Sequence, residues 1–284
     1  MALNKIKVFF SMIDISHSLF GLPFAYMGAF LAARGWPGGM NLIWITVAMV
    51  CARTAALCMN RLIDRDIDAA NPRTSGWAIP SGQLSVPIIW GITFVFLALL
   101  FFAAYQLNPL CVKLAPLAVL VLWGYSYTKR FTWWCHFILG LAIGIGPAGG
   151  WIAITGTFDW QPFVLGMAVA CWIAGFDIIY ACQDIHFDRS HGLYSIPARF
   201  GQAGALRYSA WFHAWTVIFF ILTGLILDLG LFYYLSVVFV AVILLYEHSL
   251  VRPGDLRNVQ LAAFKINHYV GLIVFAVTLL DLYC

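Results

Sequence analysis

The chain has 284 residues, of which 63% are hydrophobic and only 10% are charged. Because soluble domains carry roughly 25% charged residues, this composition and the mean hydropathy of +0.88 exclude a soluble globular protein and indicate an integral membrane protein. The formal net charge of +4 is distributed along the chain, so it does not indicate nucleic-acid binding. The length allows a single transmembrane domain, 1–284, with no polar segment long enough for a separate soluble one.

Apolar runs long enough to cross a bilayer recur along the whole chain. A transmembrane helix needs about 20 mostly apolar residues, and about nine such runs are present. We therefore expect an all-α bundle of about nine transmembrane helices around a central cavity. The runs lie near 14–33, 40–60, 84–104, 108–127, 133–155, 163–182, 208–227, 230–250 and 264–283.

The connections between these runs alternate in charge. The side reached after the even-numbered runs holds 14 of the 16 basic residues, and the exceptions are Arg34 and Lys113. Because the positive-inside rule places the basic side in the cytoplasm, we expect a cytoplasmic N-terminus and an external C-terminus in an inner or plasma membrane. Nine of the 12 acidic residues lie on the same side. The positive-inside rule does not explain them, whereas an active site that faces the cytoplasm does.

Two long cytoplasmic connections, roughly 61–83 and 183–207, each begin with Asp residues four apart and end with turn residues. We expect both to form partly helical caps over the mouth of the bundle. The glycine-rich run 140–150 permits close helix contact or a local opening, and tight packing is the favoured interpretation. The seven Cys residues form no Cys-x-x-Cys pair, so we interpret them as small buried hydrophobic residues. The seven His residues show no metal-binding spacing and are interpreted as hydrogen-bonded or interfacial side chains.

The first acidic motif ends the second apolar run. Because a helix advances about 100° per residue, Asn60, Asp64 and Asp68 fall within about 80° on one face, whereas Asp66 points away. Like charges four residues apart repel, and charge beside an apolar segment is costly. A Mg²⁺ ion held by oxygen ligands would offset that cost. The alternative is a solvated loop whose carboxylates pair with neighbouring arginines.

The second acidic motif closes the sixth apolar run. Asp184 and Asp188 are again four residues apart, and Asp177 precedes them on the same stripe. Together the two motifs suit Mg²⁺ ions that clamp one diphosphate and activate it as a leaving group. Basic side chains nearby can contact the remaining phosphate oxygens, although each also has an interpretation as a topology or headgroup residue. The candidates for diphosphate binding are Arg53, Arg73, Lys129, Arg130 and Arg199.

The motifs Asn60-x₃-Asp64-x₃-Asp68 and Asp184-x₃-Asp188, in a chain of about nine spans, resemble those of the UbiA superfamily of intramembrane aromatic prenyltransferases. The resemblance covers essentially the whole chain and is strongest to the 4-hydroxybenzoate polyprenyltransferase branch and related menaquinone-pathway members. Further segments that carry it are Arg53-Thr54, Asn71-Pro72-Arg73-Thr74, Pro80-Ser81-Gly82, Tyr125-x-Tyr127-Thr128-Lys129-Arg130, Asp177-x₂-Tyr180 and Ser195-Ile196-Pro197.

The resemblance implies Mg²⁺-dependent transfer of a polyprenyl group from a polyprenyl diphosphate to a 4-hydroxybenzoate-like or naphthoate-like ring in ubiquinone or menaquinone biosynthesis. The diphosphate would ionise to an allylic cation, which needs a water-poor site and is stabilised by aromatic faces. The implied metal ligands are Asn60, Asp64, Asp68, Asp184 and Asp188. The residues expected to act in catalysis are Asp64, Asp184 and Asp177. The residues expected to line the aromatic and prenyl pocket are Tyr125, Tyr127 and Tyr180.

Three positions depart from this pattern. The resemblance leads us to expect basic residues where the chain has Asp14, Trp77 and Ser190, so we hypothesise that weaker diphosphate contacts mark a variant substrate. Two alternatives stay open: an enzyme of the same fold with a haem, chlorophyll-type or glycerol-lipid acceptor, and a transporter with intramembrane carboxylates. Because transporters place coupling charges near the midplane, acidic clusters at the ends of spans favour an enzyme.

Overall fold

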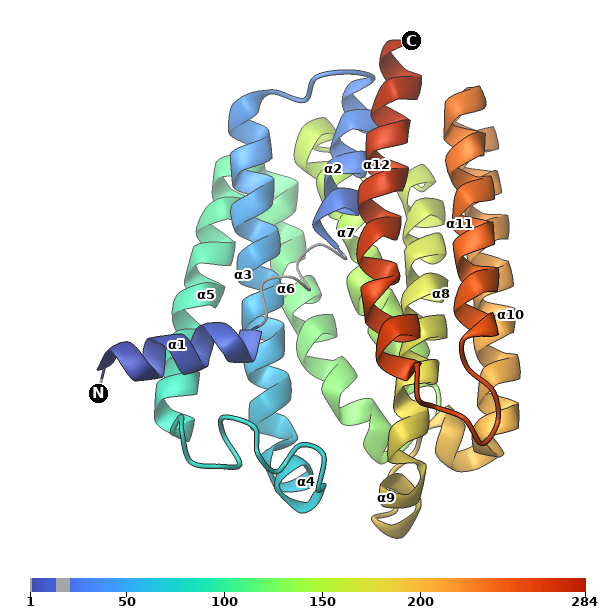
Figure 1. The fold of residues 1–284 in the computed structure, drawn as a ribbon. Helices are drawn as coiled ribbons and strands as arrows, with labels where there is room; N and C mark the ends of the chain where they lie inside the picture. The colour runs from blue at the N-terminus through green and yellow to red at the C-terminus, as the bar shows by residue number, and fades with distance from the viewer. Residues whose placement is uncertain (1, 14–20) are drawn as a thin grey trace.

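The computed structural model describes residues 2–13 and 21–284. Within this part of the chain every assigned element is a helix and no strand is formed. Figure 1 shows long helices that stand side by side, with short helices at the lower end of the bundle. The α-helices are α1 (Ala2–Ile13), α2 (Leu22–Ala33), α3 (Gly39–Ile63), α4 (Arg65–Ala70), α5 (Val86–Leu107), α6 (Pro109–Gly124), α7 (Cys135–Thr155), α8 (Gln161–Ala181), α9 (Ile185–Ser190), α10 (Ile196–Leu227), α11 (Leu231–Ser249) and α12 (Asn267–Tyr283). Three further helical turns are η2 (Tyr125–Arg130), η3 (Cys182–Asp184) and η4 (Leu261–Lys265).

Eight helical stretches of the described chain are long and apolar enough to cross a membrane. The expected all-α, multi-pass membrane architecture is therefore confirmed. The first of the expected spans is represented by the shorter apolar helix α2, and residues 14–20, which were expected to complete it, lie outside the described residues. The expected count of about nine spans thus corresponds to eight long helical stretches and one short apolar helix in the described chain.

Local sequence signals account for several helix ends. The Asn108 side chain accepts hydrogen bonds from the amides of Leu110 and Cys111, both at 3.0 Å, and so caps the N-terminus of α6. Ser195 caps α10 in the same way through the amide of Ala198. Proline occupies the first or second position of α2, α5, α6, α8 and α10, where its missing N–H leaves no hydrogen bond unmade.

Glycines set the close approach of α7 to its neighbours. A Cβ at Gly144 would overlap the carbonyl of Gly166 on α8, and a Cβ at Gly150 would overlap the carbonyl of Ala25 on α2. By contrast, Gly149 faces open space beside the cavity described below. The structure therefore confirms tight helix packing as the reason for most of this glycine-rich run.

The centre of the bundle is α8, the most buried of the spanning helices. Trp172 on this helix is fully buried and packs against Phe24 of α2, with the ring centroids 5.6 Å apart. The same apolar cluster extends to Phe220 of α10, Tyr233 of α11 and Val270 of α12. This packing fixes α8 relative to the helices that surround the site.

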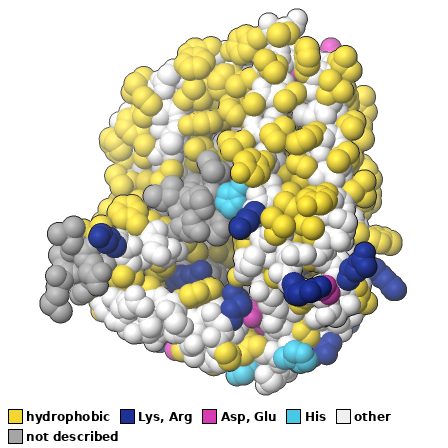
Figure 2. Space-filling view, viewed as in Figure 1, with side chains coloured by type: hydrophobic (Ala, Val, Ile, Leu, Met, Phe, Trp, Pro, Cys, Tyr) yellow, Lys and Arg dark blue, Asp and Glu magenta, His cyan; other side chains and the backbone are white. Residues whose placement is uncertain are grey.

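The two segments expected as caps lie at one end of the bundle (Figure 1). Each contains a six-residue helix, α4 or α9, that begins directly after an aspartate. The second segment also contains the start of α10, which bends at Gly201, where φ is 69° and ψ is 177°, and then continues to Leu227. On the face drawn in Figure 2, charged side chains gather toward this end, whereas hydrophobic side chains cover the opposite end.

Candidate active site

The helix that carries the first acidic motif is interrupted at Asp64, where φ is −93° and ψ is 2°. The four-residue spacing nevertheless survives, because the Asp64 amide donates to the Asn60 carbonyl at 2.9 Å and the Asp68 amide donates to the Asp64 carbonyl at 2.7 Å. Asn60 Nδ2 donates to Asp64 Oδ2 at 3.0 Å, so these two side chains share a face. The side chain of Asp66 is 88% exposed and lies 3.4 Å from Arg65. The prediction that Asp66 points away from the shared face is therefore confirmed.

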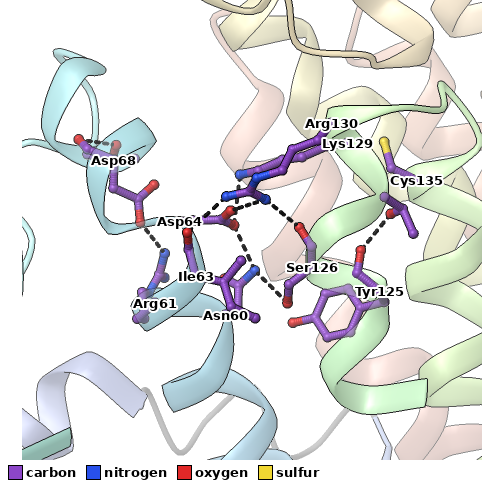
Figure 3. A network of polar contacts seen from close by, with 12 residues as sticks. Asn60, Arg61, Ile63, Asp64, Asp68, Tyr125, Ser126, Lys129, Arg130 and Cys135 are labelled. Atoms are coloured by element: carbon purple, nitrogen blue, oxygen red, sulfur yellow. Dashed lines mark hydrogen bonds and ion pairs between the residues drawn. The ribbon is translucent and has the colours of Figure 1, made fainter. Parts of the chain in front are cut away.

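The Asp64 carboxylate is buried at 2% exposure between two cations of η2. Lys129 Nζ lies 2.8 Å from Oδ2, and Arg130 Nη1 lies 2.9 Å from Oδ1. Arg130 also donates to the backbone carbonyls of Ser126, at 3.0 Å, and Ile63, at 2.8 Å. Figure 3 shows both cations reaching from η2 toward the end of α3. Helix α3 and η2 are thus joined around one carboxylate.

Asp68 lies on α4 in the first cap and is 7% exposed. Burial raises the pKa of the Asp68 carboxyl, because desolvation disfavours the charged form, and the nearby Arg61 guanidinium opposes that shift. Arg61 Nη1 is 3.7 Å from Asp68 Oδ2, and its guanidinium carbon lies 3.6 Å from the ring centroid of Trp77. Trp77 therefore offers an aromatic face to the cation that accompanies Asp68.

Asp184 of the second motif is held by the loop that follows α4. Arg73 contacts both carboxylate oxygens, with Nε 2.9 Å from Oδ1 and Nη2 2.5 Å from Oδ2. Asn71 Nδ2 donates to Oδ1 at 3.1 Å. Arg73 Nη1 also donates to the Tyr180 hydroxyl at 2.8 Å. The first cap and the end of α8 are thereby joined by a bidentate ion pair.

Asp188 connects the second cap to the start of α10. Its Oδ2 accepts a hydrogen bond of 2.7 Å from Ser195 Oγ, the same hydroxyl that caps α10. The neighbouring Tyr194 amide donates to the Lys129 carbonyl at 2.7 Å, so this segment also touches η2. The two acidic motifs, far apart in sequence, therefore meet around η2 at the same end of the bundle (Figure 1).

A cavity of about 590 Å³ extends from this end between helices α2, α3, α5, α6, α7 and α8. Its described lining is almost entirely apolar, and the charged residues in it are Arg53 and Asp177. Asp177 Oδ2 lies 2.7 Å from Nδ1 of the buried His136. Tyr125 also lines the cavity and directly precedes Ser126, whose hydroxyl accepts a hydrogen bond from Asn60. Tyr125 therefore lies at the boundary between the apolar cavity and the carboxylates (Figure 3).

Two of the predicted diphosphate-binding arginines lie away from the described carboxylates of the two motifs. Arg53 lies in the cavity wall, and its position seven residues before Asn60 places it about 10 Å farther along α3. The guanidinium of Arg199 lies over the rings of Trp133 and Phe200, 5.4 Å and 5.5 Å from their centroids. Arg73, Lys129 and Arg130 are the members of the predicted set that the structure brings onto the carboxylates.

Of the three predicted pocket tyrosines, two lie at the cavity or beside a residue that lines it, and one does not. Tyr125 lines the cavity, and Tyr180 lies between the Arg73 guanidinium and the cavity-lining Phe264. Tyr127 is 38% exposed and packs edge-on against the exposed Trp123, outside the cavity. Of the departures noted in the sequence, Ser190 is exposed and donates to the Phe187 carbonyl at 2.9 Å. Asp14 lies outside the described residues.

Sequence reasoning missed several polar residues of the site. Asn71 and Ser195 lie in segments that carry the resemblance, so the sequence held a signal for them, but spacing does not show which carboxylates they bind. Ser126 was not singled out. His136 carried no signal in the sequence, because its partner Asp177 lies 41 residues away and spacing alone does not pair them.

The oxygen donors of the two motifs are of the types that bind a hard divalent cation. Carboxylate and amide oxygens are the ligands that Mg²⁺ prefers. Asp64 Oδ1 and Asp68 Oδ2 are buried and make ion pairs with Arg130 and Arg61, but neither oxygen accepts a hydrogen bond among the described residues. No three acidic, His or Cys side chains of the described chain converge on one point. Instead, basic groups face the individual carboxylates: Lys129 and Arg130 at Asp64, and Arg73 at Asp184. The ligand types therefore fit Mg²⁺, while basic side chains supply the positive charge in this arrangement.

Comparisons with known proteins agree with the all-helical membrane fold. The sequence profile of the UbiA prenyltransferase family matches residues 21–269. The chain is 31% identical over 256 residues to a protein of Francisella tularensis subsp. mediasiatica (strain FSC147) named 4-hydroxybenzoate octaprenyltransferase, and the match covers 88% of each chain. The apo structure of a UbiA homologue from Aeropyrum pernix K1 is 33% identical and superposes with a TM-score of 0.86, covering 94% of this chain and 98% of that one.

A UbiA homologue from Archaeoglobus fulgidus, solved bound to DMAPP and Mg²⁺, shares the fold with a TM-score of 0.68 at 19% identity, over 94% of this chain and 98% of that one. These findings confirm the resemblance to prenyltransferases that the motifs carried. The chain belongs to the UbiA prenyltransferase family.

Proposed function

We propose that this prenyltransferase moves a polyprenyl group from a polyprenyl diphosphate to a small aromatic hydroxy acid, with 4-hydroxybenzoate as the first candidate, in a Mg²⁺-dependent reaction of quinone biosynthesis. The observation that carries the proposal is the position of two acidic motifs and their cations at the mouth of an apolar cavity whose charged described lining is Arg53 and Asp177. A Francisella relative with the name 4-hydroxybenzoate octaprenyltransferase supports the choice of acceptor.

The carboxylate cluster suits the diphosphate. Bound Mg²⁺ would neutralise the diphosphate and polarise it as a leaving group. Three basic side chains that lie on the carboxylates are within reach of the same space and can donate to phosphate oxygens. The residues proposed to hold the metal are Asn60, Asp64, Asp68, Asp184 and Asp188. The residues proposed to contact the phosphates are Arg73, Lys129 and Arg130.

The cavity suits the two organic groups. Its apolar wall removes isoprenoid surface from water. Its two charged lining residues, Arg53 and Asp177, have opposite charges and can bind different groups of a hydroxybenzoate. Arg53 is suited to the carboxylate of the acceptor, and Asp177 with His136 is suited to the phenol hydroxyl. Because Arg53 lies in the cavity wall, its proposed partner is the acceptor and not the diphosphate.

The reaction follows from these positions. The allylic C–O bond breaks and its electron pair leaves with the diphosphate. An electron pair of the ring then forms the new C–C bond to the allylic carbon, and the proton lost from the same ring carbon restores aromaticity. Asp177 lines the cavity and contacts His136, and it is the group placed to accept the hydroxyl proton or the ring proton of the acceptor. An apolar wall keeps water away from the allylic cation.

The test is product formation by membranes that contain the protein. Labelled prenyl diphosphates of several chain lengths are supplied with 4-hydroxybenzoate, with a dihydroxynaphthoate or with a glycerol-phosphate lipid, before and after removal of divalent metal with EDTA. We expect a prenylated benzoate only with metal present and restored activity when Mg²⁺ is returned. If product forms with the glycerol lipid and with neither aromatic acid, the proposed aromatic acceptor is wrong. Full activity after metal removal would refute the metal dependence.

A further inference from the structure

The connection into the last helix contains a π turn. Residues Leu261–Lys265 form η4, in which the Ile266 amide donates to the Leu261 carbonyl at 3.2 Å, five residues back. Single π turns are rare in helices and leave nearby carbonyls without their usual α-helical partners. Such a turn persists only where surrounding groups satisfy those carbonyls.

Asn267 supplies the missing partners. Its Nδ2 lies 3.0 Å from the Ala262 carbonyl and 3.3 Å from the Ala263 carbonyl, and it is 2.9 Å from Glu247 Oε2 on α11. Its Oδ1 accepts a hydrogen bond of 2.6 Å from Trp172 Nε1 on α8. Asn267, Glu247 and Trp172 are each fully buried. All the side-chain polar atoms of Asn267 are hydrogen-bonded in this buried setting, whereas Glu247 Oε1 has no hydrogen-bond partner among the described residues. Buried hydrogen bonds of this kind hold the turn in place, and loss of Asn267 would leave its partners unpaired.

The π turn carries Phe264 to the reaction end of the cavity. The Phe264 ring lines the cavity and meets Tyr180 edge-on, with centroids 4.7 Å apart and planes at 74°. It also packs at 6.3 Å against Phe176, whose chain neighbour is the cavity-lining Asp177. Tyr180 is the tyrosine that accepts a hydrogen bond from Arg73. The Phe264 ring is therefore placed where apolar wall and polar cluster meet.

We infer that Phe264 is a substrate-contacting ring that faces the allylic carbon during transfer, and that Asn267, held by Glu247 and Trp172, is the positioning residue that keeps the ring there through the π turn. The inference rests on the proposed function. Its physical reason is that an aromatic face stabilises positive charge in a site without water. If the π turn were replaced by a regular α-helical turn, which holds one residue less, the Phe264 ring would be rotated by about 100° around the helix axis, away from its place in the cavity.

The first test lowers the π-electron density of the Phe264 ring in steps while its shape stays nearly the same. Phe264 is replaced by phenylalanine with one, two or three ring fluorines, and the single-turnover rate is measured with saturating prenyl diphosphate and 4-hydroxybenzoate. We expect the rate to fall stepwise, to about a tenth with three fluorines, and Phe264→Leu to lose about tenfold. The affinity for a non-ionisable prenyl thiolodiphosphate should stay within about twofold, because its ground state carries no cation.

The matched control is Phe275, a ring of α12, the helix that follows η4, and it packs on Tyr26 and Phe30 of α2. The same fluorinations at Phe275 should leave the rate unchanged. A rate that does not respond to fluorination at Phe264, in an enzyme that makes product, overturns the inference. Absence of product from the unmodified enzyme with every substrate pair would instead refute the proposed function, so the two failures are distinguishable.

The second test concerns the positioning residue. Asn267→Leu removes the contacts to the turn, so we expect a slower rate and also the loss of its dependence on fluorination at Phe264. Thr278→Val is the control, since it removes a buried hydroxyl of the same helix, donated to Val274, and should keep that dependence. If Asn267→Leu does not fold, Glu247→Leu, which removes one contact of the network, replaces it. Retained fluorine dependence in both network variants would show that the turn does not position the ring.

Discussion

At the scale of single residues, neighbours in the first acidic motif have opposite environments. Asp64 is buried between Lys129 and Arg130, whereas Asp66, two residues later, projects into solvent. Both are carboxylates in the same segment, so composition does not separate them. The difference comes from helix geometry, which turns alternate residues to different sides.

Replacement of Asp64 by Asn tests this difference directly. We expect Asp64→Asn to reduce turnover by about 100-fold or more, because a ligand charge for the diphosphate site is lost while the size of the side chain is kept. Asp66→Asn is the matched control and should stay within about twofold of the unmodified enzyme, since exposed charges contribute little. The measurement is transfer of labelled prenyl groups, with Tm recorded for each variant. Equal losses at both positions would contradict the assignment.

A second prediction concerns Trp77. Its ring lies 3.6 Å from the Arg61 guanidinium carbon and 5.6 Å from that of Arg73, and these cations accompany Asp68 and Asp184. Trp77→Leu should raise the KM for prenyl diphosphate about threefold to tenfold, because both cations lose an aromatic face.

Trp77→Phe keeps an aromatic face and should recover most of that affinity. Trp36→Leu serves as the control, because Trp36 is 66% exposed and lies in the connection from α2 to α3. Figure 1 shows this connection at the end of the bundle away from α4 and α9. A KM for the prenyl diphosphate that is the same in Trp77→Leu and in the unmodified enzyme would show that stacking does not order the two arginines.

At the scale of elements, the packing distance between α7 and its neighbours depends on glycines. Because Gly150 touches the Ala25 backbone and Gly144 touches the Gly166 backbone, α7 approaches α2 and α8 more closely than larger residues permit. The neighbouring Gly149 has no such contact. Helix spacing beside the cavity is thus set by particular glycines of the run.

The adjacent pair Gly149 and Gly150 therefore gives a controlled experiment. Gly150→Ala should destabilise the protein by about 1–3 kcal/mol or more, because the new methyl group overlaps a backbone carbonyl that has no room to move. Gly149→Ala should leave Tm unchanged or slightly higher, since Ala is the better helix former and its methyl group has open space. Thermal unfolding in detergent measures both. Similar Tm values for the two variants would show that α2 and α7 are not in close contact.

At the scale of the whole molecule, the charged end and the C-terminus lie at opposite ends of the bundle. Figure 1 shows α4 and α9 at one end and the last turn of α12 at the other. Arg34, one of the two basic exceptions, follows α2 at the end opposite α4, where its Nη1 donates to the Leu227 carbonyl at 3.1 Å. This separation supports the proposal that the carboxylates face the cytoplasm and the C-terminus lies outside.

The exposed Cys284 reports on that orientation. A membrane-impermeant maleimide should label Cys284 in intact cells, because the predicted topology places it outside. The variant Cys284→Ser should lose this labelling and serves as the control. Labelling of Cys284 only after the membrane is opened would reverse the proposed orientation.

Much of the fold could be predicted because it depends on contiguous stretches of sequence. A run of about 20 apolar residues specifies a membrane helix wherever its neighbours lie. The shared face of Asn60 and Asp64 also follows from local spacing, and the structure joins them by a hydrogen bond. The break at Asp64, which starts α4, was not predicted, because the motif was treated as one continuous helix.

The candidate site could be predicted less completely. The sequence identified Arg73, Lys129 and Arg130 together with Arg53 and Arg199, but it contained nothing to separate them. Arg73 reaches Asp184 across 111 residues of chain, and no spacing rule describes that distance. Phe264 was one of many aromatic residues until a π turn placed it beside Tyr180.

The sequence by itself determined that this protein is a multi-pass membrane protein with charge on one side and two carboxylate motifs of four-residue spacing. Hydrophobicity and helical periodicity are properties of a segment and need no partner. Only the tertiary structure decided which cation faces which carboxylate, that Arg53 belongs to the cavity wall, and that His136 stands behind Asp177. The physical reason is that these contacts depend on how helices pack against one another, and packing is set by many small fits spread over the whole bundle.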